Sequence, residues 1–423
     1  MNDLTGDYKD RKKNSLDGAI YGDGQGDGDG LDNQKAAASD ALTQVRREIN
    51  QIDQALAPLL ARRMDCSARV ADIKSAEGIP VLDAAREEAV IDQAARRGAP
   101  YGPYVAGVYR SLMGVSRELQ RDRLRRVSPL AKRILGAADT VSTDQAAAAV
   151  TGTVACYGTD GAFSSRTAGR LYPNAPLLYC DKFADVFKAV EEGRAVRGIT
   201  PVENSTAGSV TEVYDLILQY RHYITAGVSM RIRQNLLACP GADLSTIRTV
   251  YSHPQALAQS EAFLKAHGYT AVTYASTAAA ARMVGERQDP SIAAVGSAEA
   301  AALYGLEVLQ ADIQANPHNA TRFIAISKEL RIAPDANKVS LVFSLPHVTG
   351  SLHRLLGHFA ARGLNLTKLE SRAAAAGGFQ YLFYVDFAMG KGNDDMVHLL
   401  TALEDETEDL AFLGNYKEIS MER

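Results

Sequence analysis

The chain has 423 residues, of which 46% are hydrophobic and 23% are charged, as is ordinary for globular proteins. This length is too great for one hydrophobic core and predicts two to four domains. The formal net charge of -4 and the lack of a long run of Lys and Arg argue against nucleic acid or an anionic membrane as the partner, so a small metabolite is the better expectation.

The cysteines and the N-terminus indicate the compartment. Four cysteines lie far apart, with no C-x-x-C pair and no nearby pair of histidines, which predicts neither a zinc site nor a disulfide framework. The N-terminus has no apolar signal segment, and no apolar run approaches the roughly 20 residues that cross a bilayer. We therefore expect a cytoplasmic protein.

The first part of the chain predicts a tail and one long helix. Residues 1–38 are rich in Gly and Asp and almost free of large apolar side chains, which is typical of a disordered tail. From Asp40 to about Glu77 apolar residues recur with a heptad-like spacing that predicts a helix. Such a helix spans roughly 55 Å, longer than a small domain is wide, so we expect it to pair with another chain. Pro58 predicts a kink near Gln54.

Two further helices are predicted, over residues 83–97, with Asp83 as the cap, and over about 103–126. Because this region shows no strand pattern, residues 39–127 are expected to form an all-α domain of three helices. Residues 128–150, which contain a run of alanines, are expected to be a linker.

The hydrophobic period changes after Thr153, and short apolar strands alternate with helical stretches. This alternation predicts α/β layers with a mostly parallel sheet over residues 151–330. The predicted strands are residues 154–157, 177–179, 198–200, 250–252 and 293–295.

The last segment, residues 331–423, has a different order of elements. Strand, helix, strand, strand, helix and strand follow one another, and a βαββαβ order is typical of a ferredoxin-like unit. These elements are predicted over residues 339–345, 351–361, 364–372, 381–387, 394–403 and 411–416, with a turn at 377–378.

A first set of polar residues lies on the predicted helices. Its members are Arg46, Arg63, Lys74, Asp83, Arg86, Glu87, Ser116 and Gln120. Arg63 and Lys74 are about three helical turns apart and project to within about 20° of one another, so both can line one pocket. Arg46 points roughly 100° away, so a symmetric partner could supply it. Arg63 stands at an apolar position of the stripe and is either paired with an anion or a satisfied structural arginine.

With these residues, segment 40–126 resembles the all-helical chorismate mutases. The resemblance implies a three-helix subunit that intertwines with a second copy, and a first-helix arginine that reaches the partner's site. It also implies the unimolecular rearrangement of chorismate to prephenate, which needs no acid, base or cofactor. By this resemblance Arg46 and Arg63 bind the two carboxylates, with Arg86 alongside, and Lys74 and Gln120 donate to the ether oxygen. Glu87, with Asp83 near it, accepts from the ring hydroxyl, and Ser116 takes part in substrate binding.

Six short motifs occur in order in the α/β segment. They are DGAFS at 160–164, PVENS at 201–205, SHPQALAQ at 252–259, STA at 276–278, AALYGL at 301–306 and NATRF at 319–323. With them, residues 153–327 resemble prephenate dehydratase over the whole length of this segment. The resemblance implies two α/β lobes with the site in the cleft, similar to type 2 periplasmic binding proteins. It also implies that prephenate loses its carboxylate and ring hydroxyl to give phenylpyruvate.

The resemblance assigns roles within these motifs. The Thr of the Thr-Arg-Phe motif is taken in the family as the donor to the departing hydroxyl, which implies this role for Thr321. Glu203 either feeds the proton or pairs with a local arginine or backbone cap, and Arg322 either pairs with a substrate carboxylate or holds the loop. His253 is expected to be a turn residue rather than a base. The residues expected to orient the substrate are Asn204, Ser205, Gln255 and Asn319.

Residues 339–418 resemble an ACT regulatory domain of the phenylalanine-sensing type. Such domains pair across subunits and bind an amino acid at the interface, which implies phenylalanine as the effector. The residues that carry the resemblance and the implied regulatory site are Gly350, Ser351, Leu352, Glu370, Ser371 and Arg372, together with the NLT sequence at 365–367.

The three resemblances together predict a bifunctional chorismate mutase and prephenate dehydratase of phenylalanine biosynthesis. It would act as a homodimer or higher homo-oligomer, on chorismate and prephenate, without metal or nucleotide. A prephenate dehydrogenase is disfavoured because no G-x-G-x-x-G opens a strand-turn-helix unit. A non-enzymatic amino-acid-binding regulator is the alternative, and turnover of prephenate would distinguish the two.

Overall fold

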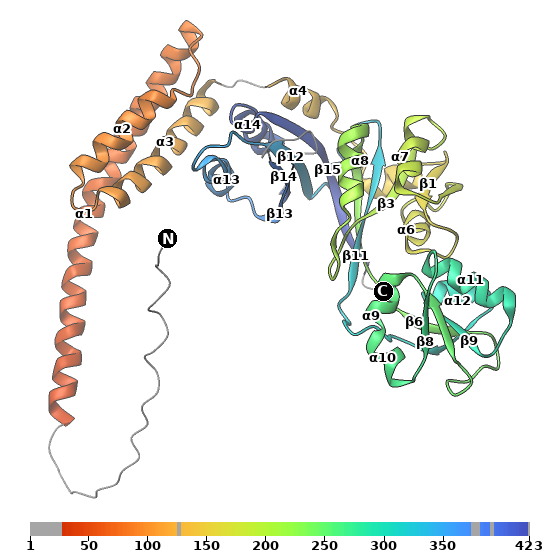
Figure 1. Ribbon diagram of the computed structural model, residues 1–423. Helices are drawn as coiled ribbons and strands as arrows, with labels where there is room; N and C mark the ends of the chain where they lie inside the picture. The colour runs from red at the N-terminus through yellow and green to blue at the C-terminus, as the bar shows by residue number, and fades with distance from the viewer. Residues whose placement is uncertain (1–27, 125–127, 374–380, 390–392, 422–423) are drawn as a thin grey trace, which may run out of the picture. The chain divides into compact units, whose positions relative to one another are not determined.

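The computed structural model of the protein describes residues 28–124, 128–373, 381–389 and 393–421 (Figure 1). The chain divides into two compact units after Cys66. The first unit holds the N-terminal part of helix α1 (Gly28–Glu77), and the second holds the rest of this helix and all later elements. None of the helices within the described ranges is long and apolar enough to cross a membrane. The expected cytoplasmic location stays a prediction.

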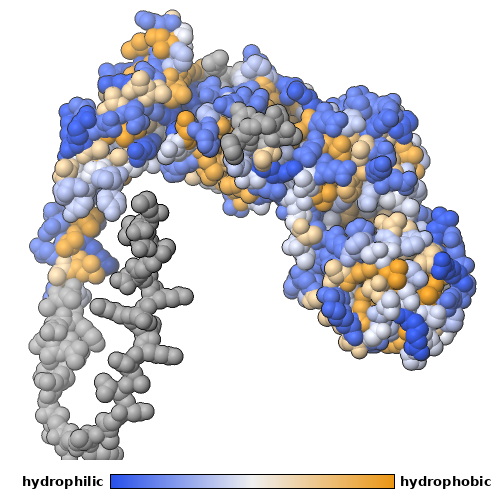
Figure 2. All heavy atoms as spheres, viewed as in Figure 1, coloured by the Kyte–Doolittle hydropathy of each residue, from blue (hydrophilic) through white to orange (hydrophobic). Residues whose placement is uncertain are grey.

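Helix α1 begins earlier than its apolar stripe predicts. It starts at Gly28, so the tail predicted for residues 1–38 is wrong over 28–38, where Gln, Lys and three alanines favour a helix; residues 1–27 lie outside the described part of the chain. The helix continues through Pro58. Figure 2 shows exposed apolar side chains on this helix among polar ones. They include Leu42, Val45, Ile49, Ile52, Leu56 and Leu59, which are between 46% and 64% exposed. This stripe fits the predicted pairing with a second copy, which stays a prediction.

The predicted second and third helices are confirmed as α2 (Ala84–Arg97) and α3 (Gly102–Leu124). The carboxylate of Asp83 caps α2 by accepting from the backbone N–H of Arg86 at 3.0 Å, as its residue type predicts. The two helices pack through Ile91, Ala106 and Met113. Residues 125–127, where the third helix was predicted to end, lie outside the described residues.

The predicted linker is not a free connector. It contains α4 (Pro129–Gly136) and α5 (Thr143–Ala148), and Ser128 caps the former. Leu130 and Ile134, one helical turn apart, are buried in the hydrophobic core of the C-terminal segment. The Thr143 hydroxyl donates to Asp335 at 2.8 Å. The linker interpretation is therefore wrong, because an amphipathic turn inside it has a core to pack against.

Residues 151–330 form two lobes. The first contains β1 (Val154–Tyr157), β2 (Leu177–Cys180), β3 (Arg197–Asn204), β4 (Gly208–Ser209), β5 (Tyr223–Arg231), β11 (Ala320–Ser327), α6 (Phe163–Leu171), α7 (Phe183–Glu191) and α8 (Thr211–Tyr220). The second contains β6 (Asn235–Ala238), β7 (Thr249–Ser252), β8 (Thr270–Thr273), β9 (Ile292–Gly296), β10 (Glu307–Gln310), α9 (Pro254–Gln259), α10 (Glu261–Ala266), α11 (Thr277–Arg287) and α12 (Ala298–Leu303). The five predicted strands are present. The sheets are mixed rather than mostly parallel, because β11 returns from the second lobe and runs antiparallel to both β3 and β5.

The predicted βαββαβ order of the last segment is confirmed. Its elements are β12 (Lys338–Ser344), α13 (Ser351–Ala361), β13 (Leu366–Ala373), β14 (Tyr381–Ala388), α14 (Asn393–Glu404) and β15 (Asp409–Met421). The predicted turn at 377–378 lies outside the described residues. We call β13, β14, β12 and the first part of β15 the C-terminal half-sheet.

Strand β15 is longer than predicted and joins the C-terminal half-sheet to the first lobe (Figure 1). Its first part pairs antiparallel with β12, and Lys417 to Met421 pair parallel with β5. One sheet with the order β13-β14-β12-β15-β5-β11-β3-β1-β2 results, with β4 beside β3. The domain boundary predicted at residue 330 therefore separates two regions that share a continuous sheet.

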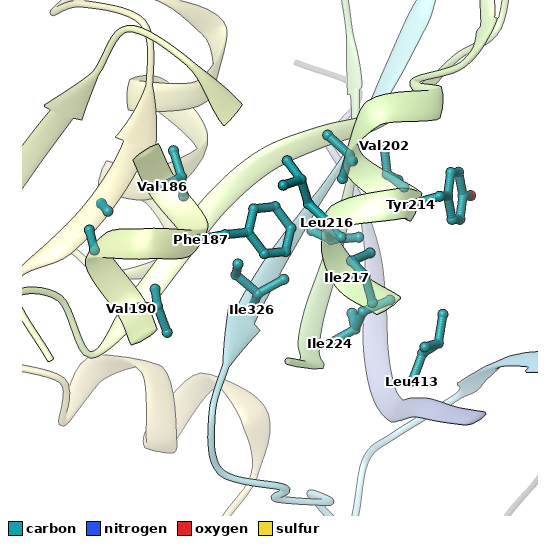
Figure 3. Close-up of a cluster of buried hydrophobic side chains, with 14 of the residues drawn as sticks. Val186, Phe187, Val190, Val202, Tyr214, Leu216, Ile217, Ile224, Ile326 and Leu413 are labelled. Atoms are coloured by element: carbon teal, nitrogen blue, oxygen red, sulfur yellow. The ribbon is translucent and has the colours of Figure 1, made fainter. Parts of the chain in front are cut away.

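The crossing point of β15 requires a glycine. Gly414 has φ +155°, and a Cβ atom there would lie 2.2 Å from the backbone oxygen of Ile224 on β5. Beside it, Leu413 is buried in the core of the first lobe with Phe187, Ile217 and Ile224 (Figure 3). The C-terminal strand is thus part of the hydrophobic core behind the first lobe.

Candidate active sites

The residues of the predicted helical set belong to different compact units. Arg46 and Arg63 belong to the first unit, where Arg46 is exposed and Arg63 is half-buried on α1. Their roles as carboxylate ligands stay predictions.

The other members of the helical set lie in the second unit. Lys74 donates to the backbone oxygens of Pro80 at 2.9 Å and Val81 at 2.6 Å, so two of its three ammonium donors hold the turn after α1. Ser116 donates to the Leu112 carbonyl oxygen at 2.8 Å and Gln120 is buried on the same helix, α3. The side-chain oxygen of Gln120 finds no hydrogen-bond partner within the described ranges. A buried amide oxygen without a donor is costly and suits a site that another group completes.

Glu87 contacts an arginine that the sequence did not single out. Arg117, buried on α3, donates to the Glu87 carboxylate and lies 3.4 Å from Glu406, just after α14. Arg86 is exposed, and the Asp83 carboxylate acts as the cap of α2. The structure thus finds Glu87 and Asp83 with protein partners, while their predicted contacts with a substrate remain untested.

A charged cluster joins α3 to the C-terminal segment. His358 on α13 lies 3.1 Å from Glu118 on α3 and 3.1 Å from Glu406, and Arg362 also donates to Glu118. Burial alone would lower the pKa of His358, but its hydrogen bonds to the two carboxylates raise it. Burial acts to raise the pKa of Glu406, but the hydrogen bond to His358 and the nearby arginines bring it down to about 2. This cluster was missed because Glu118 lies 240 residues before His358 and 244 residues before Arg362 in the sequence.

The predicted dehydratase residues meet on β3 and β11. The Asn204 side-chain amide donates to Thr321 Oγ1 and to Asn319 Oδ1, each at 2.9 Å, and to the Ala320 carbonyl oxygen at 3.2 Å. Its oxygen accepts the backbone N–H groups of residues 206 and 207. Thr321 Oγ1 is therefore fixed as an acceptor, and no hydrogen bond donated by its hydroxyl is found in the described part of the chain. The hydroxyl proton remains available for a ligand.

The same group bridges the two lobes. Asn319, 1% exposed, donates to the side-chain oxygen of Gln259 on α9 of the second lobe at 3.1 Å. Gln259 lies within the predicted motif at 252–259, yet it was not predicted as a site residue; the motif itself was the available signal. At another contact between the lobes, the Tyr304 hydroxyl donates to the Asp160 carbonyl oxygen at 2.7 Å.

The remaining orienting residues occupy the edges of this group. Ser205 Oγ accepts from the backbone N–H of Ala320 at 2.9 Å, and Gln255 is exposed at the start of α9. His253 caps α9 by accepting from the backbone N–H of Gln255 at 3.3 Å, so its predicted place in a turn is confirmed. Burial lowers the pKa of His253.

Glu203 and Arg322 have protein partners of their own. Glu203 lies 3.2 Å from Lys368 Nζ and 3.7 Å from Arg322, which matches the predicted alternative of pairing with a local arginine. Arg322 lies 2.5 Å from Asp386 and 2.5 Å from Glu418, and it donates to the Tyr416 hydroxyl. Binding of a substrate carboxylate by Arg322 is therefore disfavoured, because two carboxylates already neutralise it.

The predicted regulatory residues separate into two places. Gly350 and Ser351, at the start of α13, line a cavity of about 700 Å³ together with Glu87, Arg117 and Arg354, and Leu352 packs on the hydrophobic core. Glu370 accepts from Ser209 of the first lobe at 2.5 Å, and Arg372 donates to the Thr211 carbonyl oxygen at 3.2 Å. Ser371, between them, is exposed.

The two parts of the chain match two known families. Residues 154–331 match the family model of prephenate dehydratase, and residues 45–121 match that of chorismate mutase type II. The matched ranges end before the C-terminal half-sheet, so its identity as an ACT domain stays a prediction. Within the described ranges no cluster of three or more His, Cys, Asp or Glu side chains is arranged to hold a metal ion.

Relatives and solved structures agree with the longer match. Arogenate dehydratase/prephenate dehydratase 2, chloroplastic, of Arabidopsis thaliana is 39% identical over 275 residues, which cover 62% of this chain and 72% of the relative. The prephenate dehydratase of Methanocaldococcus jannaschii is 38% identical over 242 residues, 56% of this chain and 86% of the relative. The structure of the Arthrobacter aurescens prephenate dehydratase in complex with L-Phe is 31% identical, with a TM-score of 0.57 over 63% of this chain and 90% of that one. The chain therefore belongs to the prephenate dehydratase family and carries a type II chorismate mutase segment ahead of its dehydratase lobes.

Proposed function

We propose that the protein converts chorismate to prephenate in its helical segment and prephenate to phenylpyruvate between the two lobes, as consecutive steps of phenylalanine biosynthesis. The observation that carries the second step is the Thr321 hydroxyl, which accepts from the Asn204 amide at 2.9 Å and thereby keeps its own proton for a ligand.

Dehydration removes the ring carboxylate as carbon dioxide and the ring hydroxyl as water, and the gain of aromaticity drives the step. The departing hydroxyl leaves as hydroxide, which a hydrogen bond must stabilise while the bond to carbon breaks, and it takes up a proton from solvent to become water. A threonine hydroxyl is a poor acid in water, so Thr321 acts as a positioned hydrogen-bond donor to this oxygen. Asn204 and Asn319 hold that donor in place, and Gln259 ties it to the second lobe.

The mutase step needs only binding and charge. The rearrangement breaks the ether bond while a carbon-carbon bond forms, and negative charge grows on the ether oxygen. Lys74 uses two of its donors on the turn at Pro80 and Val81, and we assign the third to the ether oxygen. Gln120 is the second donor, and Arg46 is supplied by a partner subunit. The apolar stripe on α1 and the unsatisfied Gln120 oxygen support a site completed by a second copy.

Phenylalanine is the proposed effector. The related Arthrobacter enzyme was solved in complex with L-Phe, which supports an amino-acid ligand in this family. We place the ligand in this chain at the start of α13, where the cavity beside Gly350 and Ser351 offers backbone donors and the side chains of Arg117 and Arg354. Glu370, Ser371 and Arg372 on β13 form the other part of the proposed regulatory set.

Arogenate is a second candidate substrate, because the name of the Arabidopsis relative includes this activity. The test is to mix purified protein with chorismate and to follow chorismate loss and phenylpyruvate gain in one sample. Parallel reactions supply prephenate or arogenate directly. Phenylpyruvate from chorismate and from prephenate supports the proposal, phenylalanine formed faster from arogenate favours the second candidate, and no turnover of either supports the non-enzymatic regulator.

A further inference from the structure

The strand pair that carries the dehydratase donor has a second, charged face. On β3 and β11, Asn204 pairs in register with Thr321, and Glu203 pairs with Arg322. Because neighbouring residues of a strand project to opposite faces, Glu203 and Arg322 lie behind the two site residues. We call the side of Glu203 and Arg322 the rear face and the side of Asn204 and Thr321 the front face. A contact that holds the rear pair also fixes the backbone of the front pair.

Lys368 of β13 holds the rear face from the C-terminal half-sheet. Its side chain is 9% exposed, and its ammonium lies 3.2 Å from Glu203, 3.1 Å from Glu370 and 2.6 Å from the Ser209 hydroxyl. An ammonium has three donors, and these three acceptors account for all of them. The same nitrogen lies 5.2 Å from the centre of the Tyr214 ring, which covers it with a favourable aromatic face.

The rear face is a network whose charges nearly balance. The carboxylates are Glu203, Glu370, Asp386 and Glu418, and the cations are Lys368, Arg322 and Lys338. Asp386 and Glu418 neutralise Arg322, so Glu203 depends mainly on Lys368, which is closer to it (3.2 Å) than Arg322 is (3.7 Å). The Glu203 side chain is 36% exposed, so removal of Lys368 leaves its carboxylate with only the more distant Arg322 and lets it turn toward solvent.

Movement of Glu203 would displace the donor on the front face. Asn204 is the next residue along the strand. Its side-chain oxygen accepts the backbone N–H groups of residues 206 and 207, and its side-chain nitrogen donates to Thr321 Oγ1. A misplacement of about 1 Å by a change outside the reacting centre can cost on the order of a hundredfold in rate. We expect most of the cost in the chemical step, because the group that Asn204 orients is the proposed donor Thr321.

We propose that Lys368 is a positioning residue for the dehydratase reaction, so that the C-terminal half-sheet completes the active site from behind through its ion pair with Glu203. The inference rests on the proposed dehydratase function.

The test compares Lys368→Met, which keeps the aliphatic stem, with Lys368→Arg, which restores the charge, in the full chain. We expect Lys368→Met to lower kcat for prephenate by at least tenfold with less than a threefold change in KM, and Lys368→Arg to recover part of the loss. The matched control is Lys328→Met, since Lys328 also joins a glutamate, Glu191 at 3.5 Å, at the other end of β11. It should leave kcat unchanged.

A double-mutant cycle with Glu203→Gln separates positioning from general loss of structure. If Lys368 acts through Glu203, Lys368→Met should cost much less in the Glu203→Gln background, whereas equal losses in both backgrounds would overturn the inference. Mutase activity in the same samples reports folding, and where Lys368→Met does not fold, Glu203→Gln alone must show the same fall in kcat without a change in KM. If the wild type converts prephenate and Lys368→Met is fully active, only this inference is overturned. If the wild type does not convert prephenate, the proposed function is overturned as well.

Discussion

Replacement of Thr321 by valine should nearly abolish dehydration while it leaves the fold intact. Valine keeps the shape and removes the hydroxyl that accepts from Asn204. The Asn204 amide has two hydrogens and, besides Thr321, two other acceptors, Asn319 Oδ1 at 2.9 Å and the Ala320 carbonyl oxygen at 3.2 Å. No buried donor is therefore orphaned, and the loss of unfolding free energy should stay within about 0.5–1.5 kcal/mol, the net contribution of one hydrogen bond.

The expected loss of catalysis is larger. A preorganised hydrogen-bond donor contributes roughly 10²–10³-fold to rate, equivalent to about 2.7–4 kcal/mol of barrier at 1.36 kcal/mol per factor of ten. The rate of phenylpyruvate formation from prephenate should fall by this factor, while mutase activity in the same preparation remains within about twofold of wild type. Thermal unfolding measures the small change in stability separately.

Two controls accompany Thr321→Val. Thr321→Ser keeps a hydroxyl at the same place and should retain much of the activity. Thr200→Val removes a hydroxyl from a fully buried threonine on β3, whose acceptor is the Pro201 carbonyl oxygen at 3.4 Å, and should not affect the rate. If Thr321→Val forms phenylpyruvate at more than about a tenth of the wild-type rate, the donor is another group and the reasoning fails.

Four further outcomes are expected. Lys74→Ala should lower mutase activity by at least tenfold and leave dehydration of added prephenate intact; equal loss of both activities would contradict the assignment. Mixing inactive Arg46→Ala with inactive Lys74→Ala under subunit exchange should restore partial mutase activity, and heterodimers without activity would contradict a shared site. The pKa of His358 is raised, so its contribution to stability is complete below pH 6.5 and is lost as the pH rises through the raised pKa. The pKa values of Glu118 and Glu406 are lowered, so their contribution is complete above pH 4.5 and is lost as the pH falls. The excess thermal stability of wild type over His358→Gln should therefore be greatest between pH 4.5 and 6.5 and shrink above that range. Calorimetry should detect phenylalanine binding at or below millimolar concentration, and its absence with the protein folded would contradict the effector site.

The sequence predicted the dehydratase donor group because its members lie in short local motifs. The alternation of strand residues also predicts that Glu203 and Asn204 project to opposite faces of β3. Which face is turned toward the proposed substrate depends on the elements that pack on the other face. That packing comes from β13, β14 and β15, which lie more than 150 residues further along the chain. Sequence patterns of single elements carry no signal for such long-range pairing.

The helices between residues 128 and 150 show the same limit. Leu130 and Ile134 form an apolar pair one turn apart, which the sequence contains, yet their burial depends on a core formed by residues from 330 onward. The extension of β15 into the first lobe likewise depends on Gly414, because only a residue without Cβ can pass the Ile224 carbonyl oxygen. Because of both features, the C-terminal half-sheet shares a hydrophobic core with α4 and a continuous sheet with the first lobe, and it is not a separate module.

This placement would give the proposed effector a physical route to both proposed reactions. From the half-sheet, Lys368 and Asp386 reach the strand pair of the dehydratase donor, while His358 and Glu406 reach α3, which carries Gln120 and the Arg117 partner of Glu87. Phenylalanine can change either rate only to the extent that it binds one arrangement of these ion pairs better than another. Such coupling would be reciprocal, so we expect prephenate to weaken phenylalanine binding by the same factor by which phenylalanine weakens prephenate binding. The dehydratase contacts join a shared sheet and core, whereas α3 is attached through ion pairs, and we therefore expect inhibition to be stronger for dehydration than for the mutase reaction.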